Sequence, residues 1–156
     1  MKRYRELVAA ALTRVREIAP WDLARELAAG WKPVLLDVRE PAEFALLHIP
    51  GSINVPRGIL EQSCEWGFDE TEPLLAAGHG LNIVVICRSG YRSALAADVL
   101  QDMGYGGVVS LKTGVRGWND FEQPLVDSAS RPVDADTAEE LLAPRLSDEQ
   151  RDPGRS

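Results

Sequence analysis

The stretch from Ile83 to Met103, IVVICRSGYRSALAADVLQDM, decides the fold of this chain. It opens with four consecutive β-branched residues, Ile83 to Ile86, which form an apolar run of strand length. The next six residues, Cys87 to Arg92, are rich in arginine, serine and glycine and predict a loop. From Ser93 apolar residues recur at helical spacing until Gly104 ends the pattern. The sequence therefore predicts a buried strand, a short loop and a helix, with a lone thiol at the end of the strand.

The position of Cys87 is that of a nucleophile. A loop wrapped over a helix N-terminus turns backbone N–H groups inward, and together with the helix dipole they form a site for an anion. Arg88 and Arg92 add positive charge, and helix N-termini and nearby arginines favour the thiolate form of a cysteine. A free cysteine at the end of a buried strand also serves as a small core residue. A core residue does not need a polar, cation-rich loop, so we expect Cys87 to react as a thiolate.

Three segments carry a resemblance to one family. The loop CRSGYRS, residues 87–93, resembles the active-site loop of single-domain rhodaneses, which are sulfurtransferases. The segment LLDVREPAEFALLHIPGSINVP, residues 35–56, resembles the first signature of that family, and LKTGVRGWNDFEQPLV, residues 111–126, resembles the closing one. The sequence departs from the family pattern at Leu47 and Thr113, where glycine is usual, and at Gly117, where alanine is usual.

The resemblance implies an activity and a set of site residues. It implies that Cys87 takes the outer sulfur of an anionic donor such as thiosulfate and passes it, as a persulfide, to cyanide or a thiol. It implies no cofactor and no metal, a small anionic sulfur donor and a thiol or cyanide acceptor, with a sulfur-relay protein as a further candidate partner. The substrate-binding residues that it implies are the rest of the loop: Arg88, Ser89, Gly90, Tyr91, Arg92 and Ser93.

Helical and strand patterns alternate from Ala19 onward. This alternation predicts an α/β fold with a mostly parallel central sheet covered by helices on both faces, as the rhodanese resemblance also implies. Ligands bind such sheets at the carboxyl ends of the strands, where Asp37, Cys87 and Thr113 lie. The expected strands are 34–38, 53–55, 83–86 and 108–111, and the expected helices are 21–29, 41–46, 57–63, 72–77, 93–103 and 115–121.

The chain divides into three predicted parts. Residues 1–18 are expected to form an amphipathic surface helix, because five residues share one helical face: Tyr4, Val8, Ala11, Val15 and Ile18. Residues 19–126 are expected to form the rhodanese-like domain. Residues 127–156 contain eight acidic residues against four arginines, which predicts a solvated acidic C-terminal extension with one or two helical turns in residues 137–142.

The composition excludes several classes of function. A chain of 156 residues with net charge -7 and a pI near 4.9 is unsuited to nucleic acid, which requires a basic surface. The sequence contains no apolar run near the ~20 residues needed to cross a bilayer, so no membrane partner is expected and a cytoplasmic location is predicted. The two cysteines and two histidines lack the spacing of a metal site.

Two alternative functions stay open at this stage. Cysteine phosphatases and arsenate reductases place the arginine six residues after the cysteine, commonly with a histidine just before it. Here Arg92 follows Cys87 by five residues and Ile86 precedes it, so the tighter loop favours a sulfur atom over a tetrahedral phosphate. The other alternative is a sulfur-carrier or partner-binding rhodanese-like module without independent turnover.

Four other residues are weaker candidates. Asp37 and Arg39 either support the cysteine loop or are a structural carboxylate and a surface arginine. His48 is expected to pack or hydrogen-bond in a turn rather than to act as a base. Cys64 is expected to be an incidental cysteine, with a resolving thiol for a Cys87 persulfide as the alternative.

Overall fold

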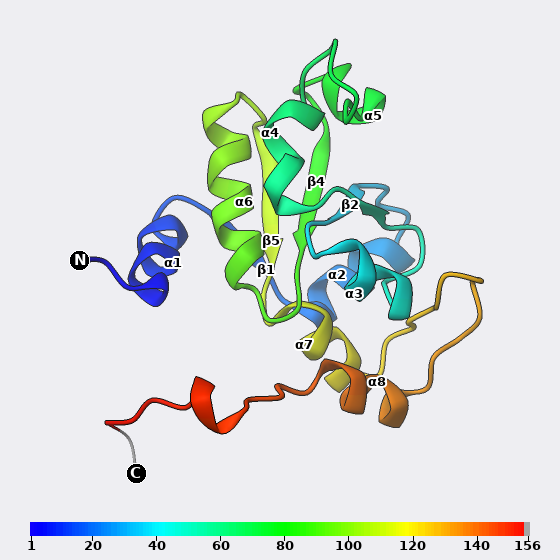
Figure 1. The fold of residues 1–156 in the computed structure, drawn as a ribbon. Coiled ribbons are helices and arrows are strands. Elements are labelled where there is room, and N and C mark those ends of the chain that lie inside the picture. Colours follow the sequence, from blue (N-terminus) through cyan, green and yellow to red (C-terminus); the bar gives the residue numbers. More distant parts are fainter. Residues whose placement is uncertain (155–156) are drawn as a thin grey trace.

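A five-stranded, all-parallel sheet forms the centre of the computed structural model, which describes residues 1–154 (Figure 1). The strand order is β1-β5-β4-β2-β3. This architecture confirms the predicted α/β class. The strands are β1 (Arg16–Ile18), β2 (Val34–Asp37), β3 (Ile53–Asn54), β4 (Asn82–Ile86) and β5 (Gly107–Leu111).

Strand β4 is the middle strand, paired with β2 on one side and β5 on the other. Its side chains alternate between two apolar clusters. Ile83 and Val85 belong to the cluster on one face of the sheet, and Val84 and Ile86 belong to the cluster on the other. Because both faces of this strand are buried, its residues do not alternate between apolar and polar, and this explains the unbroken run of β-branched residues.

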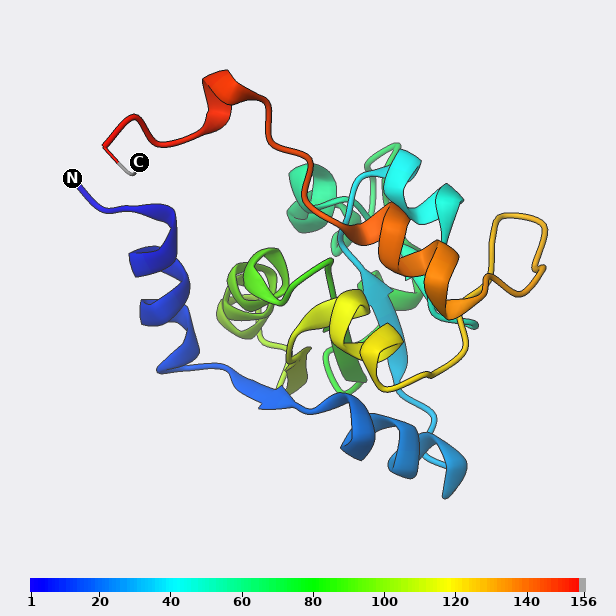
Figure 2. The ribbon, with the colours of Figure 1, turned by 90° about the horizontal axis from the view of Figure 1, so that it is seen from below.

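Helices cover both faces of this sheet (Figures 1 and 2). The cluster that contains Val85 is covered by α6 (Tyr91–Asp102), α4 (Leu60–Ser63) and α5 (Pro73–Ala76), and α1 (Tyr4–Leu12) packs against α6. The cluster that contains Val84 is covered by α2 (Pro20–Ala28), α7 (Gly114–Asp120) and α8 (Ala135–Leu142). The shorter elements are α3 (Pro41–Leu46) and the 3-10 turns η1 (Arg57–Ile59) and η2 (Asp148–Gln150).

The helix expected over residues 1–18 is wrong from residue 13 onward. Helix α1 ends at Leu12, and Arg16–Ile18 form the edge strand β1, which pairs in parallel with β5. Val15 packs into one apolar cluster and Ile18 against the other. Residues three apart share a face of a helix, but in extended chain they point to opposite faces of the sheet. Because residues 16–18 pair with β5 as a strand, the Ile18 side chain lies on the opposite face of the sheet from Val15. The division of the chain into three parts stays a prediction.

The C-terminal extension packs on the domain as far as helix α8. Helix α8 contains the predicted segment 137–142, and its first turn is capped by the Asp134 side chain, which accepts the Thr137 N–H at 2.8 Å. Ala138 and Leu142 are buried in the cluster that α7 also covers. From residue 144 to residue 154 every side chain is exposed, and both views show this segment running away from the domain.

Candidate functional site

Cys87 lies at the carboxyl end of β4 and is the first residue of the loop that leads into α6. Its side chain is buried, with 1% exposed. The Gly90 N–H donates a hydrogen bond to Cys87 Sγ at 3.1 Å, and this requires the loop to fold back sharply over three residues. Gly90 permits that fold because it adopts the left-handed conformation, with φ at 96°. One backbone N–H of the loop therefore points at the sulfur at the start of α6.

The start of α7 supports the loop from below. The Val115 N–H donates to the Cys87 carbonyl at 2.9 Å, and the Arg116 N–H donates to the Arg88 carbonyl at 3.1 Å. A Cβ atom at Gly114 would collide with these same loop carbonyls, so this position needs glycine. With its carbonyls bound to α7, the loop can present N–H groups to the pocket above Cys87.

Two departures from the family pattern compensate for each other next to this contact. Thr113 takes the left-handed conformation, with φ at 63°, at a position where glycine is usual. A Cβ atom at Gly117 would collide with the Thr113 side chain. Gly117, which stands where alanine is usual, therefore provides the space that Thr113 fills.

Buried hydroxyl groups flank the sulfur. The Cys87 thiol donates to Ser93 Oγ at 3.3 Å, and the Ser110 hydroxyl donates to the same oxygen at 2.8 Å. Both serines are fully buried. Because a hydroxyl group can rotate, the Ser93 hydroxyl can donate to the sulfur once Cys87 has lost its proton. Ser93 was predicted from the loop, whereas Ser110 lies on β5 with no motif to reveal it.

The pocket above Cys87 is small. Its volume is about 90 Å³, and it is lined by Tyr4, Cys87, Arg88, Ser89, Tyr91 and Arg92. Sites for drug-sized ligands measure roughly 300 to 1,000 Å³. The pocket thus suits a small anion. Four of the six predicted substrate-binding residues line it, Gly90 and Ser93 instead contact the sulfur, and Tyr4 was not foreseen.

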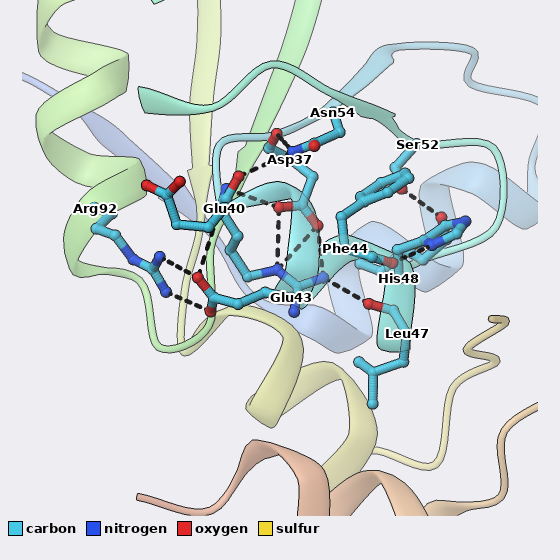
Figure 3. Close-up of polar contacts among 11 residues, drawn as sticks. Asp37, Glu40, Glu43, Phe44, Leu47, His48, Ser52, Asn54 and Arg92 are labelled. Atoms are coloured by element: carbon cyan, nitrogen blue, oxygen red, sulfur yellow. Dashed lines mark hydrogen bonds and ion pairs between the residues drawn. The ribbon is translucent and has the colours of Figure 1, made fainter. Parts of the chain in front are cut away.

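The two loop arginines have different surroundings. Arg88 forms no ion pair within residues 1–154. Arg92 donates from Nη1 and Nη2 to the two carboxylate oxygens of Glu43, at 2.7 and 3.0 Å, and Figure 3 shows the two groups facing each other. The hydrogen bonds from Arg92 lower the pKa of Glu43 against the opposing effect of burial. Glu43 therefore holds Arg92 at the edge of the pocket.

Asp37 and Arg39 form a buried pair rather than a surface pair. Arg39 is 1% exposed, so of the two alternatives for this pair the surface arginine is wrong. Its Nε and Nη2 atoms donate to Asp37 Oδ2 at 3.1 and 2.8 Å, and Nη2 also donates to the Leu47 carbonyl at 2.7 Å. Asn54 bridges the carbonyls of Asp37 and Arg39 (Figure 3). The pair fixes the end of β2, and neither side chain touches the sulfur.

The remaining sequence candidates lie outside the pocket. His48 stacks on Phe44, with ring centroids 3.8 Å apart, and its Nδ1 lies 2.8 Å from the Phe44 carbonyl oxygen (Figure 3). It packs and hydrogen-bonds as expected, but its backbone forms an isolated β-bridge with Val126 rather than a turn. Cys64 is a buried core residue, and burial raises the pKa of its thiol. In the described part of the chain, no cluster of three or more His, Cys, Asp or Glu residues could hold a metal ion. No helix there is both long and apolar enough to cross a membrane.

Comparison with known proteins gives the family. The model of the rhodanese-like domain matches residues 20–121, which is more than half of the chain. The chain belongs to the rhodanese-like family. The Cys87 loop, the Asp37–Arg39 pair and the support from α7 all lie within the matched rhodanese-like region, whereas α1 and α8 lie outside it.

Relatives of this rhodanese-like chain include two proteins of similar extent. A sulfurtransferase of Allochromatium vinosum is 32% identical over 113 residues, which cover 72% of this chain and 95% of that protein. A mitochondrial protein of Schizosaccharomyces pombe, provisionally named as a thiosulfate sulfurtransferase, is 32% identical over 103 residues, or 64% of this chain and 72% of that protein.

A solved structure from Rhodopseudomonas palustris shares the rhodanese-like fold. It is 28% identical, has a TM-score of 0.72 and covers 80% of this chain and 94% of that one. That protein is described as one of unknown function and a possible tyrosine phosphatase.

Proposed function

We propose that this rhodanese-like sulfurtransferase moves the outer sulfur of thiosulfate, or of a similar anionic donor, to cyanide or a thiol through a persulfide on Cys87. One observation carries the proposal. Cys87 Sγ accepts the Gly90 N–H, and Cys87 lines a small pocket together with Arg88, which forms no ion pair in the described part of the chain. Such a site favours a thiolate, an anionic donor and an anionic persulfide alike.

The first half-reaction forms the persulfide. The Cys87 thiolate attacks the outer sulfur of thiosulfate, a bond forms between the two sulfur atoms, and the bond from the outer sulfur to the sulfonate group breaks. Sulfite leaves with the bonding electron pair, so charge balances without a proton transfer. This agrees with a pocket whose lining contains no histidine or carboxylate that could act as a base.

The second half-reaction returns the thiolate. Cyanide or a thiolate acceptor attacks the outer sulfur of the persulfide, and Cys87 leaves as the thiolate. The Gly90 N–H and the Ser93 hydroxyl can donate to this sulfur in both states. The same groups therefore stabilise the resting thiolate and the leaving thiolate.

The loop residues have different roles in binding the donor. Arg88 supplies a cation that can pair with the sulfonate group, while Arg92 lines the edge of the pocket as one half of its ion pair with Glu43. Ser89 and Tyr91 line the pocket, and Gly90 and Ser93 contact the sulfur. The proposal also keeps the cytoplasmic location and the sulfur-relay partner as predictions from the sequence.

Phosphatase chemistry is the second candidate, because the similar Rhodopseudomonas palustris protein is described as a possible tyrosine phosphatase. A phosphatase needs an arginine whose two terminal nitrogens bind the phosphate. Here both terminal nitrogens of Arg92 bind Glu43, and the loop is one residue shorter than that of the phosphatases. Both features favour sulfur transfer.

Thiocyanate formation from thiosulfate and cyanide tests the proposal. We expect the wild type to form thiocyanate, Cys87→Ser to form none above background, and Cys64→Ser to retain most of the rate. Equal losses in the two variants would show a dithiol mechanism instead. An inactive wild type that hydrolyses an aryl phosphate would support phosphatase chemistry, and inactivity in both assays would favour a carrier or binding module.

A further inference from the structure

Tyr4 is a part of the pocket that comes from outside the family domain. It is the first residue of α1, whereas the rhodanese-like match begins at residue 20. Yet Tyr4 lines the same 90 Å³ pocket as Cys87, Arg88 and Tyr91. The N-terminal helix therefore adds a wall to a site that the rhodanese-like domain otherwise builds by itself.

Helix α1 is fixed in place on α6. Val8 and Ala11 are buried, one turn and two turns along from Tyr4, on the side that faces the domain. Beyond the end of the helix, Arg14 Nε and Nη2 donate to the two carboxylate oxygens of Asp98 on α6, at 2.8 and 2.7 Å. Figure 2 shows α1 alongside α6. These contacts hold Tyr4 at the start of α6, where the cysteine loop ends.

The Tyr4 ring contacts the Tyr91 ring, and both residues line the pocket. The two rings are arranged edge to face, with centroids 5.7 Å apart and planes at 78°. Tyr4 is 49% exposed and Tyr91 is 41% exposed, so both residues line the pocket and also reach solvent. Burial raises the pKa of Tyr4, and the charge of Cys87 raises it further, which agrees with a neutral phenol close to the thiolate.

We propose that Tyr4 is a specificity-determining residue, which narrows the mouth of the pocket together with Tyr91 and so admits small sulfur donors to Cys87 while excluding donors with a bulky group. This inference rests on the proposed sulfur transfer. In thiosulfate the outer sulfur is bound to a sulfonate group with no further substituent. In an aryl thiosulfonate the outer sulfur is bound to a sulfonyl group that carries an aromatic ring, and that ring must pass the two tyrosines.

Two donors that differ in size but undergo the same sulfur-transfer reaction can separate the effect of donor size from that of the reaction. With thiosulfate, attack by Cys87 releases sulfite, and with benzenethiosulfonate the same attack on the outer sulfur releases benzenesulfinate. Both reactions leave the same persulfide, which cyanide converts to thiocyanate. The ratio of kcat/KM for the two donors therefore measures access to Cys87, and it does not depend on the fraction of folded protein in a preparation.

The experiment compares Tyr4→Ala, Tyr4→Phe and Leu7→Ala with the wild type. Leu7 is an exposed residue of the same helix and does not line the pocket. We expect Tyr4→Ala to raise kcat/KM for benzenethiosulfonate relative to thiosulfate by about tenfold or more. Tyr4→Phe keeps the ring, so it should keep the wild-type ratio, as should Leu7→Ala. An unchanged ratio in Tyr4→Ala, or an equal shift in Leu7→Ala, would overturn the proposal.

Alkylation of Cys87 measures the same access without sulfur transfer. In a Cys64→Ser background, we expect Tyr4→Ala to raise the rate of modification of Cys87 by N-phenylmaleimide relative to that by iodoacetamide. A shift in this ratio from a protein that transfers no sulfur would disprove the proposed function and support the role of Tyr4 as a barrier. Normal sulfur transfer with no shift in either ratio would disprove the role of Tyr4 alone.

Discussion

At the scale of single residues, the buried charges of Asp37 and Arg39 form an ion pair. Arg39 and Asp37 are almost fully buried and neutralise each other, and Arg39 Nη2 also donates to the Leu47 carbonyl. Burying one such ion without its partner is costly, because the desolvation of the remaining charge has no compensation. The pair therefore holds the end of β2 in place beside Cys87 at the end of β4.

Removing Arg39 should destabilise the protein strongly. We expect Arg39→Ala to lower the free energy of unfolding, measured by urea denaturation, by about 3 to 5 kcal/mol, because Asp37 is left charged and buried. Arg57→Ala is the matched control, since Arg57 pairs with Glu61 at 2.8 Å on the exposed surface, and it should cost less than about 1 kcal/mol. Similar losses of unfolding free energy in the two variants would show that the buried pair stabilises the fold no more than the surface pair does.

The sequence identifies residues whose chemistry is local and misses those whose partners are distant. Cys87, Gly90 and Ser93 belong to one short loop, and their order predicts their contacts. Ser110 and Tyr4 reach the site through a strand pairing and a helix packing that no local pattern reveals. For Arg39 the sequence left two alternatives open, support of the cysteine loop or a surface arginine, and the buried Asp37 at the end of β2 explains why Arg39 is buried.

At the scale of elements, the pair of Arg92 and Glu43 joins α6 to α3 beside the pocket. Both side chains are about one third exposed, so water weakens their attraction. The Arg92 hydrogen bonds lower the pKa of Glu43 below its ordinary value. Glu43 therefore stabilises the fold above the ordinary glutamate pKa of about 4.3, and this contribution is lost as the pH falls through the lowered value.

The stability contribution of Glu43 should depend on pH with that sign. We expect Glu43→Gln to cost a measurable amount below about 1 kcal/mol in urea denaturation near neutral pH, and less near pH 3, where the wild-type carboxylate is being protonated. Glu139→Gln, at an exposed position on α8, should show no such change in cost between the two conditions. A cost for Glu43→Gln that rises toward acid pH would contradict the assignment.

At the scale of the whole molecule, the domain is completed by segments from both ends of the chain. Strand β1 adds the edge of the sheet beside β5, and α8 covers α7 with Ala138 and Leu142. The central strands, the cysteine loop and most helices could be predicted, because each has its own periodicity and turn residues. The edge strand β1 could not be predicted, because three residues are too few to show a strand periodicity and their conformation depends on pairing with β5.

The packing of α8 on the domain should contribute to the free energy of unfolding. Leu142 is 4% exposed and the adjacent Leu141 is 38% exposed. We expect Leu142→Ala to lower the free energy of unfolding by about 2 kcal/mol or more, because it removes buried methyl groups from the cluster under α7. Leu141→Ala should change it by about 0.5 kcal/mol or less. Equal small effects in the two variants would mean that α8 contributes little to the fold.

The decisive measurement is the intact mass of the reduced protein after mixing with thiosulfate, with no acceptor present. We expect a gain of one sulfur atom in the wild type and in Cys64→Ser, no gain in Cys87→Ser, and loss of the added sulfur when cyanide follows. A gain that persists in Cys87→Ser, or no gain in any of the three proteins, would contradict the transfer of thiosulfate sulfur through a persulfide on Cys87.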